Sequence, residues 1–267
     1  MAKAKPARPE FREWVDAKPE SNWGLMPLTH VAKGLLARDI IRDRRIEPSE
    51  CEVFDRALAY FFYGRPAYRV SGDGAIRDAA TCPFCFIFDP SIIDRAQAIH
   101  AFDTGAFDRR MYNHVLMEEM QVGDFSLERD TRRPNRLIRC VFGDRETYFE
   151  GDTSKIPTPD EITEQGDFLA RAYIKLLRSE GRNEVDDRIC TIEVTFGDPV
   201  LLDGALLAVV VPDILWNDKQ KTVWLADLDA SGVEVLPFRF SVGREPAYHQ
   251  ALIEQEVRAY YAKNQYL

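Results

Sequence analysis

The sequence lacks the motifs that identify several large classes of enzyme. It contains no G-x-G-x-x-G, no G-x-x-x-x-G-K-[ST] and no G-x-S-x-G. Their absence argues against Rossmann enzymes, P-loop NTPases and ordinary α/β-hydrolases. There is also no H-E-x-x-H, so a zincin protease has no support.

Long apolar runs are absent, and cysteines are few. No stretch approaches the ~20 apolar residues that a membrane span needs, and no apolar segment of a signal peptide follows the basic start of the chain. With five cysteines, we expect a cytoplasmic protein with reduced thiols and no membrane partner.

Positive charge is in deficit. The 267 residues carry a formal net charge of -9, and the sequence pI is about 5.1. This balance argues against a broad basic surface for duplex nucleic acid, because phosphate binding needs clustered lysine and arginine. A local basic groove stays open as an alternative. Hydrophobic residues make up 45% of the chain, enough for a large core.

The apolar pattern predicts an α+β fold. Residues 1–22, rich in proline and charge, predict a flexible arm before a single domain over 23–267. We expect strands over 23–30, 44–48, 57–63, 84–88, 96–102, 188–196, 200–202 and 206–211, and a hairpin of 222–228 with 233–240. Helices are expected over 31–42, 111–120 and 245–265, and another is expected to begin at a capping box of Thr158 and Glu161 and to continue through the apolar spacing of 168–177. Strands scattered among helices favour a mixed or antiparallel sheet flanked by helices.

The Cys82-Pro-Phe-Cys85 motif is the most visible candidate for chemistry. Such a pair can be redox-active or half of a zinc site. A redox pair usually lies where a strand enters a helix, whereas this motif enters an apolar strand. A zinc site would need a second pair of ligands, which the spacing of the other cysteines and histidines does not offer. We therefore favour two packed cysteines and expect no metal.

Three further features are separated along the chain. Thr29-His30 is predicted to end a strand and open a helix. Tyr63-Gly-Arg65-Pro-Ala-Tyr68 follows an aromatic strand. Glu193 lies inside an apolar strand, on the same side as its threonine neighbours at 191 and 195. Each feature alone has an ordinary explanation: a histidine bonded to backbone, a turn arginine, a solvated strand face.

In this order, the three features resemble the DarT-like ADP-ribosyltransferase toxins. Members of that family open with a strand ending in Thr-His and a helix like 31–42, continue with an aromatic strand like 59–68, and carry a catalytic glutamate on a later strand. The resemblance is specific over about 23–70. It implies a split, ADP-ribosyltransferase-like sheet with an insertion around 104–180. Glu118 and Glu119 are rival glutamates on an expected helix.

The resemblance also implies an activity, a substrate and roles for these residues. NAD would be the substrate, bound by the Thr29 backbone, by His30 at a ribose and by Tyr63 or Tyr68 against the nicotinamide. Arg65 would pair with the pyrophosphate. Glu193 would stabilise the positive charge that develops on the ribose and would activate the acceptor. The acceptor would be a nucleic acid or a protein. A toxin or phage-defence effector of this kind implies an antitoxin or regulatory partner.

Two other functions remain open. The first is a catalytically inactive binding or regulatory module of the same fold, which the acidic surface favours. The second is a metal-dependent nuclease or hydrolase that uses Asp103, Asp108, Glu118 and Glu119.

Overall fold

The computed structural model describes residues 7–51, 53–67, 74–179, 188–217 and 222–267. It is a mixed α+β structure with mostly antiparallel strand pairs flanked by helices, as the sequence predicted. The chain divides into two compact units: unit 1 holds residues 1–23 and 97–194, and unit 2 holds residues 24–96 and 195–267. The predicted single domain with an insertion around 104–180 stays a prediction.

Unit 2 is built on a sheet in the order β11-β10-β5-β1-β4. These strands are β1 (Leu28–Lys33), β4 (Arg56–Tyr63), β5 (Pro83–Phe88), β10 (Leu206–Pro212) and β11 (Glu234–Phe238). Of these pairs only β10 with β11 is parallel. β3 (Ser49–Cys51) extends the sheet beside β4, whereas β2 (Arg45–Ile46) and β9 (Val200–Leu201) pair with each other.

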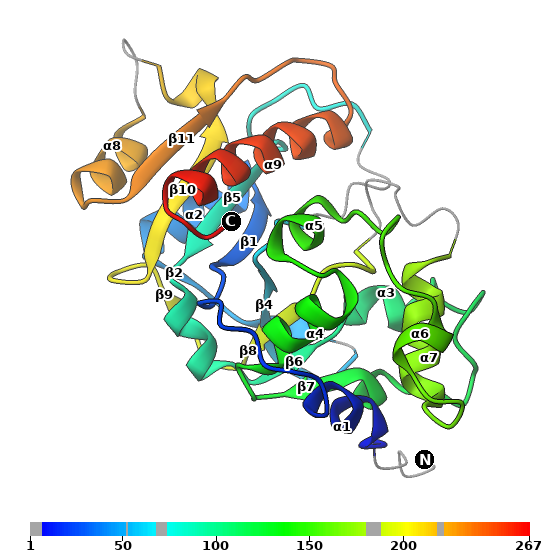
Figure 1. Cartoon of the computed structure of the whole chain (residues 1–267). Helices are drawn as coiled ribbons and strands as arrows, with labels where there is room; N and C mark the ends of the chain where they lie inside the picture. Colours follow the sequence, from blue (N-terminus) through cyan, green and yellow to red (C-terminus); the bar gives the residue numbers. More distant parts are fainter. Residues whose placement is uncertain (1–6, 52, 68–73, 180–187, 218–221) are drawn as a thin grey trace. The chain divides into compact units, whose positions relative to one another are not determined.

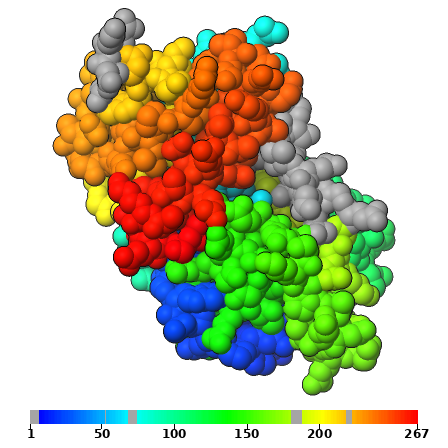
Figure 2. All heavy atoms as spheres, turned by 45° about the horizontal axis from the view of Figure 1, so that its top comes forward, coloured from blue at the N-terminus to red at the C-terminus, as the bar shows by residue number. Residues whose placement is uncertain are grey.

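Helices cover both faces of this sheet (Figure 1). α9 (Pro246–Lys263) packs on β5, β10 and β11, and α2 (Gly34–Asp43) packs on β1 and β5. α8 (Val223–Ala230) packs on α2, and its Trp224 ring lies 6.2 Å from the ring of Phe84 on β5. In Figure 2, α9 (red) and the orange segment with α8 and β11 form a continuous surface of this unit. Because both faces are covered, every residue of β5 is buried.

Unit 1 is mainly helical. It contains α1 (Glu10–Asp16), α3 (Thr104–Asp108), α4 (Arg133–Val141), α5 (Arg145–Glu150), α6 (Pro159–Ile162) and α7 (Phe168–Leu177), with the antiparallel strands β6 (Ala98–His100) and β7 (Ser126–Glu128). Its core is aromatic: the Phe11 ring lies 5.5 Å from Phe125 and 5.2 Å from Tyr173. The chain passes from unit 1 to unit 2 within β8 (Glu193–Phe196).

Several predicted elements are confirmed. The strand at 57–63, the strand at 84–88 and the C-terminal helix are all present. The helix predicted to begin at Thr158 is divided into α6 and α7, because residues 163–167 are not helical. The Thr158 capping box forms as expected, with the Glu161 carboxylate accepting hydrogen bonds from the Thr158 amide at 2.6 Å and hydroxyl at 2.8 Å. No helix in the described ranges combines the length and the apolar character that crossing a membrane requires.

The start of the chain differs from its prediction. Residues 10–16, expected in a flexible arm, form α1, which buries Phe11, Trp14 and Val15. This spacing places the three side chains on one face of the helix, so they enter the core of unit 1. The preceding Arg8 is also bonded, because its guanidinium and its amide both contact the buried carboxylate of Asp124.

The predicted hairpin around 229–232 is wrong. Residues 223–230 form α8, and β11 pairs in parallel with β10. The turn residues end a helix instead: Gly232 has φ +92°, and the Val233 amide donates to the Leu228 carbonyl five residues earlier at 3.4 Å. That pattern terminates helices with a left-handed glycine, so a glycine typical of a hairpin turn was in fact a helix C-terminal residue.

The predicted helix over 111–120 is also absent. This segment forms successive turns after Arg110, whose φ is +59°. Tyr112, Leu116 and Met120 are buried at four-residue spacing, which explains the helical appearance of the sequence. The single α-type bond from the Leu116 amide to the Tyr112 carbonyl is not continued into a helix.

Candidate functional site

Two predicted site residues of unit 2 are in direct contact. Thr29 is fully buried in β1, and its hydroxyl donates to the carbonyl of Arg65 at 3.1 Å, with a second acceptor in the Phe62 carbonyl at 3.3 Å. The pairing of β1 with β4 places Thr29 opposite Phe62, three residues before Arg65. The Thr29 side chain therefore anchors the backbone of the turn that carries Arg65.

The turn after β4 depends on a glycine. Gly64 has φ +70°, and a Cβ added there would lie 2.6 Å from the Met26 Cε and 2.7 Å from its Sδ. Its amide donates to the Pro27 carbonyl at 2.8 Å. A left-handed residue at this position reverses the chain at once, and glycine adopts that conformation without steric cost. The half-buried Arg65 is thus presented directly after the strand.

His30 faces the opposite side of the sheet from Thr29, because neighbouring side chains alternate along a strand. β1 continues to Lys33, so the prediction that Thr29-His30 ends the strand is wrong. Pairing with β5 holds the strand as far as Lys33, opposite Pro83. The helix α2 begins at Gly34, where the backbone is so close to the Ala79 carbonyl oxygen that an added Cβ would lie 2.1 Å from it.

A hydrogen bond selects one tautomer of the neutral His30 ring. Its Nδ1 lies 2.8 Å from the Tyr60 carbonyl oxygen, which can only accept, so Nδ1 carries the proton. Burial lowers the pKa of His30, and the bond to the Tyr60 carbonyl partly offsets this effect. The ring also lies near Phe61 and Phe86, with centroid distances of 5.3 and 6.2 Å. Nε2 is therefore the acceptor atom of this histidine.

The two predicted stacking tyrosines have different outcomes. Tyr63 is fully buried, and its hydroxyl accepts a hydrogen bond from the Met26 amide at 3.0 Å. In this arrangement the ring supports the segment before β1. Tyr68 lies outside the described residues, and its predicted role stays a prediction.

Glu193 begins β8 and is held by a single threonine of unit 1. Thr104 contacts both carboxyl oxygens: its amide donates to Oε2 at 3.0 Å, and its hydroxyl lies 2.7 Å from Oε1. Only 1% of the Glu193 side chain is exposed, so the expectation of a solvated strand face is wrong. Its neighbours Thr191 and Thr195 are buried as well.

Glu193 lies in a cluster of buried polar groups. Burial, followed by the charge of Asp103, raises the pKa of the Glu193 carboxyl from its usual 4.5 to about 8, and the bonds from Thr104 oppose this rise. Asp103 accepts from the Ala106 amide at 2.7 Å at the start of α3, and it forms an ion pair with Arg188 at 2.6 Å. The Nδ1 of His100 lies 3.9 Å from the Glu193 Oε1. An acid with this environment is a candidate for proton transfer.

The predicted residues thus fall into two groups. Thr29, His30, Tyr63 and Arg65 lie in unit 2, and Glu193 lies in unit 1. The convergence of His30, Arg65 and Glu193 on one NAD site stays a prediction. Thr104 was missed by sequence reasoning, although the polar His100 inside an apolar segment was a visible signal of buried chemistry nearby.

The residues of the nuclease hypothesis are dispersed. Asp103 is paired with Arg188, whereas Glu118 and Glu119 are exposed in the turns that replace the predicted helix. Within the described ranges, no three His, Cys, Asp or Glu side chains are grouped as a metal site.

The Cys82-x-x-Cys85 pair is packed in the core of unit 2. Both cysteines are buried and free. Burial raises the pKa of Cys82 to about 12, and it raises that of Cys85 still further, with a contribution from the negative charge of Glu254. Thiols held in the protonated form are poor nucleophiles, as expected for cysteines that serve as small apolar side chains.

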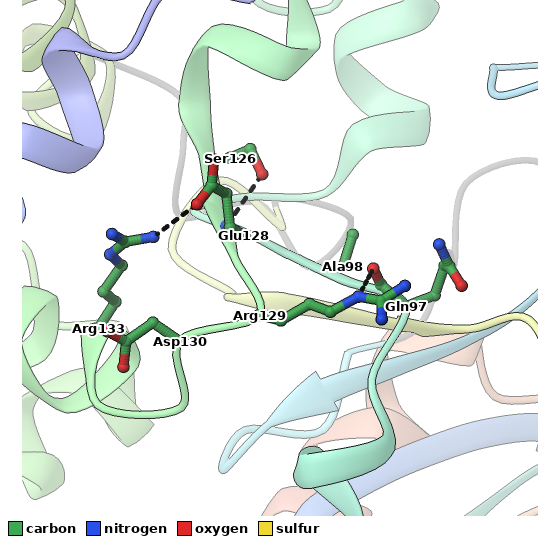
Figure 3. A pocket seen from close by; sticks show the side chains of 7 residues that line it. All are labelled: Gln97, Ala98, Ser126, Glu128, Arg129, Asp130 and Arg133. Atoms are coloured by element: carbon green, nitrogen blue, oxygen red, sulfur yellow. Dashed lines mark hydrogen bonds and ion pairs between the residues drawn. The ribbon is translucent and has the colours of Figure 1, made fainter.

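A polar hollow of about 590 Å³ lies beside β6 and β7 in unit 1 (Figure 3). Arg129 extends along it and donates from Nε to the Gln97 carbonyl at 3.0 Å. Arg133 reaches Glu128 across it at 3.3 Å. No predicted site residue lines this hollow. Arg129 and Arg133 are thus already bonded to neighbouring residues of unit 1.

Comparisons of the chain with protein-family models, with curated proteins and with solved structures find no match.

Proposed function

We propose that this chain transfers ADP-ribose from NAD to a macromolecular acceptor, as the DarT-like ADP-ribosyltransferases do. The observation that carries the proposal is the bond from the Thr29 hydroxyl to the Arg65 carbonyl at 3.1 Å. It joins two residues that the family resemblance marks independently. The mixed α+β architecture with mostly antiparallel strands is compatible with an ADP-ribosyltransferase-like fold.

The proposed roles in unit 2 follow from the chemistry of each side chain. Arg65 binds the pyrophosphate, because a guanidinium offers a planar fork of donors to phosphate oxygens. His30 is neutral with its proton on Nδ1, so Nε2 accepts a hydrogen bond from a ribose hydroxyl. The backbone after Thr29 holds the nicotinamide amide, and Tyr68 stacks against its ring.

Glu193 is the proposed catalytic acid–base group. When the bond between nicotinamide and ribose breaks, the electron pair leaves with nicotinamide and positive charge develops on the ribose carbon. An ionised Glu193 stabilises that charge and then takes the proton of the attacking acceptor. The positive charge on the nicotinamide ring of bound NAD favours the carboxylate form, which opposes the raised pKa of the free protein. We therefore expect activity to rise with pH between about 6 and 8.

The test uses labelled NAD with DNA, RNA and protein acceptors. We expect transfer of label by the wild-type chain and its loss in Glu193→Gln and Arg65→Ala. Glu118→Gln is the matched control, because Glu118 is an exposed glutamate of the same unit. Calorimetry with NAD separates binding from transfer: Arg65→Ala should weaken binding, and Glu193→Gln should leave it nearly unchanged. A wild-type chain that does not bind NAD would refute the proposal.

A second candidate is a catalytically inactive binding or regulatory module of the same fold. It is favoured by the burial of two predicted site residues. Glu193 is buried and bonded to Thr104, and Tyr63 is buried and bonded to the Met26 amide in the segment before β1. A chain that binds a partner protein tightly, and whose affinity is unaffected by NAD or by Glu193→Gln, would support this candidate over the first.

A further inference from the structure

Helix α9 buries two polar side chains on its apolar face. The face that packs on the sheet of unit 2 contains Ile253 and Val257, and it also contains His249 and Gln250. Gln250 is only 2% exposed. A glutamine amide in such a place loses its bonds to water, so its position calls for a partner in the protein.

That partner is the turn that carries Arg65. The Gln250 Nε2 donates to the Pro66 carbonyl at 3.2 Å and to the Glu254 Oε1 at 3.1 Å. The amide oxygen of Gln250 is buried and has no hydrogen-bond partner among the residues that the structure describes. The NH₂ group of the Gln250 amide is thus bonded, whereas its oxygen is not. Of its two bonds, the one to Pro66 joins α9 to the turn that carries Arg65.

Three successive residues of this turn are held from three different places. The Gly64 amide donates to the Pro27 carbonyl at 2.8 Å, ahead of β1. The Arg65 carbonyl accepts from Thr29 in β1, and the Pro66 carbonyl accepts from Gln250 in α9. Such anchors fix the backbone on both sides of the Arg65 Cα, and a fixed backbone limits where its guanidinium can reach.

We propose that Gln250 is a positioning residue for Arg65, acting through the Pro66 carbonyl. The role of Arg65 in binding NAD rests on the proposed function, whereas the restraint of the turn rests on the contacts alone. The inference places the third anchor of the turn on α9, 184 residues further along the chain.

The first experiment tests the restraint without any ligand. Gln250→Met keeps the shape of the side chain and removes the donor. Gln255→Met on the exposed side of the same helix is the matched control. We expect amide hydrogen exchange at Gly64 and Arg65 to be about 3- to 10-fold faster in Gln250→Met, as loss of one hydrogen bond predicts. Equal exchange in the two variants, at equal global stability, would overturn the inference.

The second experiment tests whether the restraint acts through the arginine. We expect Gln250→Met to weaken NAD binding by about 2- to 10-fold in calorimetry. In an Arg65→Ala background the same change should have no effect, because the group that Gln250 positions is gone. An equal loss in both backgrounds would contradict a role through Arg65.

The two experiments also separate this inference from the proposed function. A wild-type chain that ignores NAD but shows faster exchange in Gln250→Met would refute the function and retain the restraint. A wild-type chain that binds NAD, with exchange and affinity unchanged in Gln250→Met, would refute the restraint and retain the function.

Discussion

Replacing Glu193 by glutamine should remove a large pH dependence of stability. In the folded protein the Glu193 carboxyl has a pKa of about 8, against a usual value of 4.5. Between these pH values the folded chain holds a proton that the unfolded chain has released. Stability therefore falls as pH rises through this window. Below it both states are protonated, and above it the full cost of burying the carboxylate is present.

The magnitude follows from the size of the window. One pH unit across a window of this kind changes the free energy of unfolding by at most about 1.4 kcal/mol. The full rise from 4.5 to about 8 corresponds to an upper limit of about 4–5 kcal/mol. Rearrangement around an ionised carboxylate reduces this cost, so we expect a loss of about 2–4 kcal/mol between pH 5 and pH 9.

Glutamine reproduces the hydrogen bonds of the protonated acid. Its amide oxygen accepts from the Thr104 amide, as Oε2 does at 3.0 Å. The Thr104 hydroxyl, which donates to Oε1 at 2.7 Å, can rotate to accept from the glutamine NH₂ group. Because glutamine does not ionise, Glu193→Gln should match the wild-type stability near pH 5 and exceed it at pH 9.

The assay is urea unfolding followed by circular dichroism at one-unit steps from pH 5 to pH 9. Glu118→Gln, at an exposed position of the same unit, should keep the wild-type dependence on pH. If Glu193→Gln and the wild type lose stability in parallel over this range, the buried carboxyl is not protonated as described and the reasoning is refuted.

Three other changes have expected outcomes. Gly64→Ala should lower the free energy of unfolding by about 1–2 kcal/mol because of its positive φ, whereas Gly24→Ala, which has no atom within 4 Å of the added Cβ, should change it little; urea titration measures both. Thr104→Val should destabilise by about 1–3 kcal/mol by removing the hydroxyl next to buried Glu193, and Thr104→Ser should recover most of this loss in the same titration. Cys85 should resist iodoacetamide in the native protein at pH 8 and react in urea, because burial raises the pKa of its thiol; mass spectrometry that finds rapid native labelling would contradict this.

The elements that were predicted correctly are those whose pattern is local. The apolar run at 84–88 is a strand buried on both faces, and the spacing of apolar residues over 168–177 is that of a helix with one core face. The capping box of Thr158 and Glu161 spans three residues and forms as expected. In each case the interactions that decide the structure lie within a few positions of one another.

The predictions that were wrong concern segments whose local sequence pattern is compatible with two different secondary structures. Gly232 is suited to both a hairpin turn and a helix C-terminus, and the parallel pairing of β11 with β10 decides between them. Similarly, the length of β1 is set by β5, which pairs with it as far as Lys33. A strand partner some 50 residues away is not visible in a window of ten.

For the site, the sequence alone determined which residue types are available: a glycine that permits the Arg65 turn, a threonine and a histidine side by side on a strand, and a glutamate among apolar neighbours. Strand alternation already sends Thr29 and His30 to opposite faces. Only the tertiary structure decided what these side chains contact. Glu193 meets Thr104 across 89 residues, and Pro66 meets Gln250 across 184. Such contacts, and the pKa shift that burial causes, depend on packing between distant segments, which no local pattern encodes.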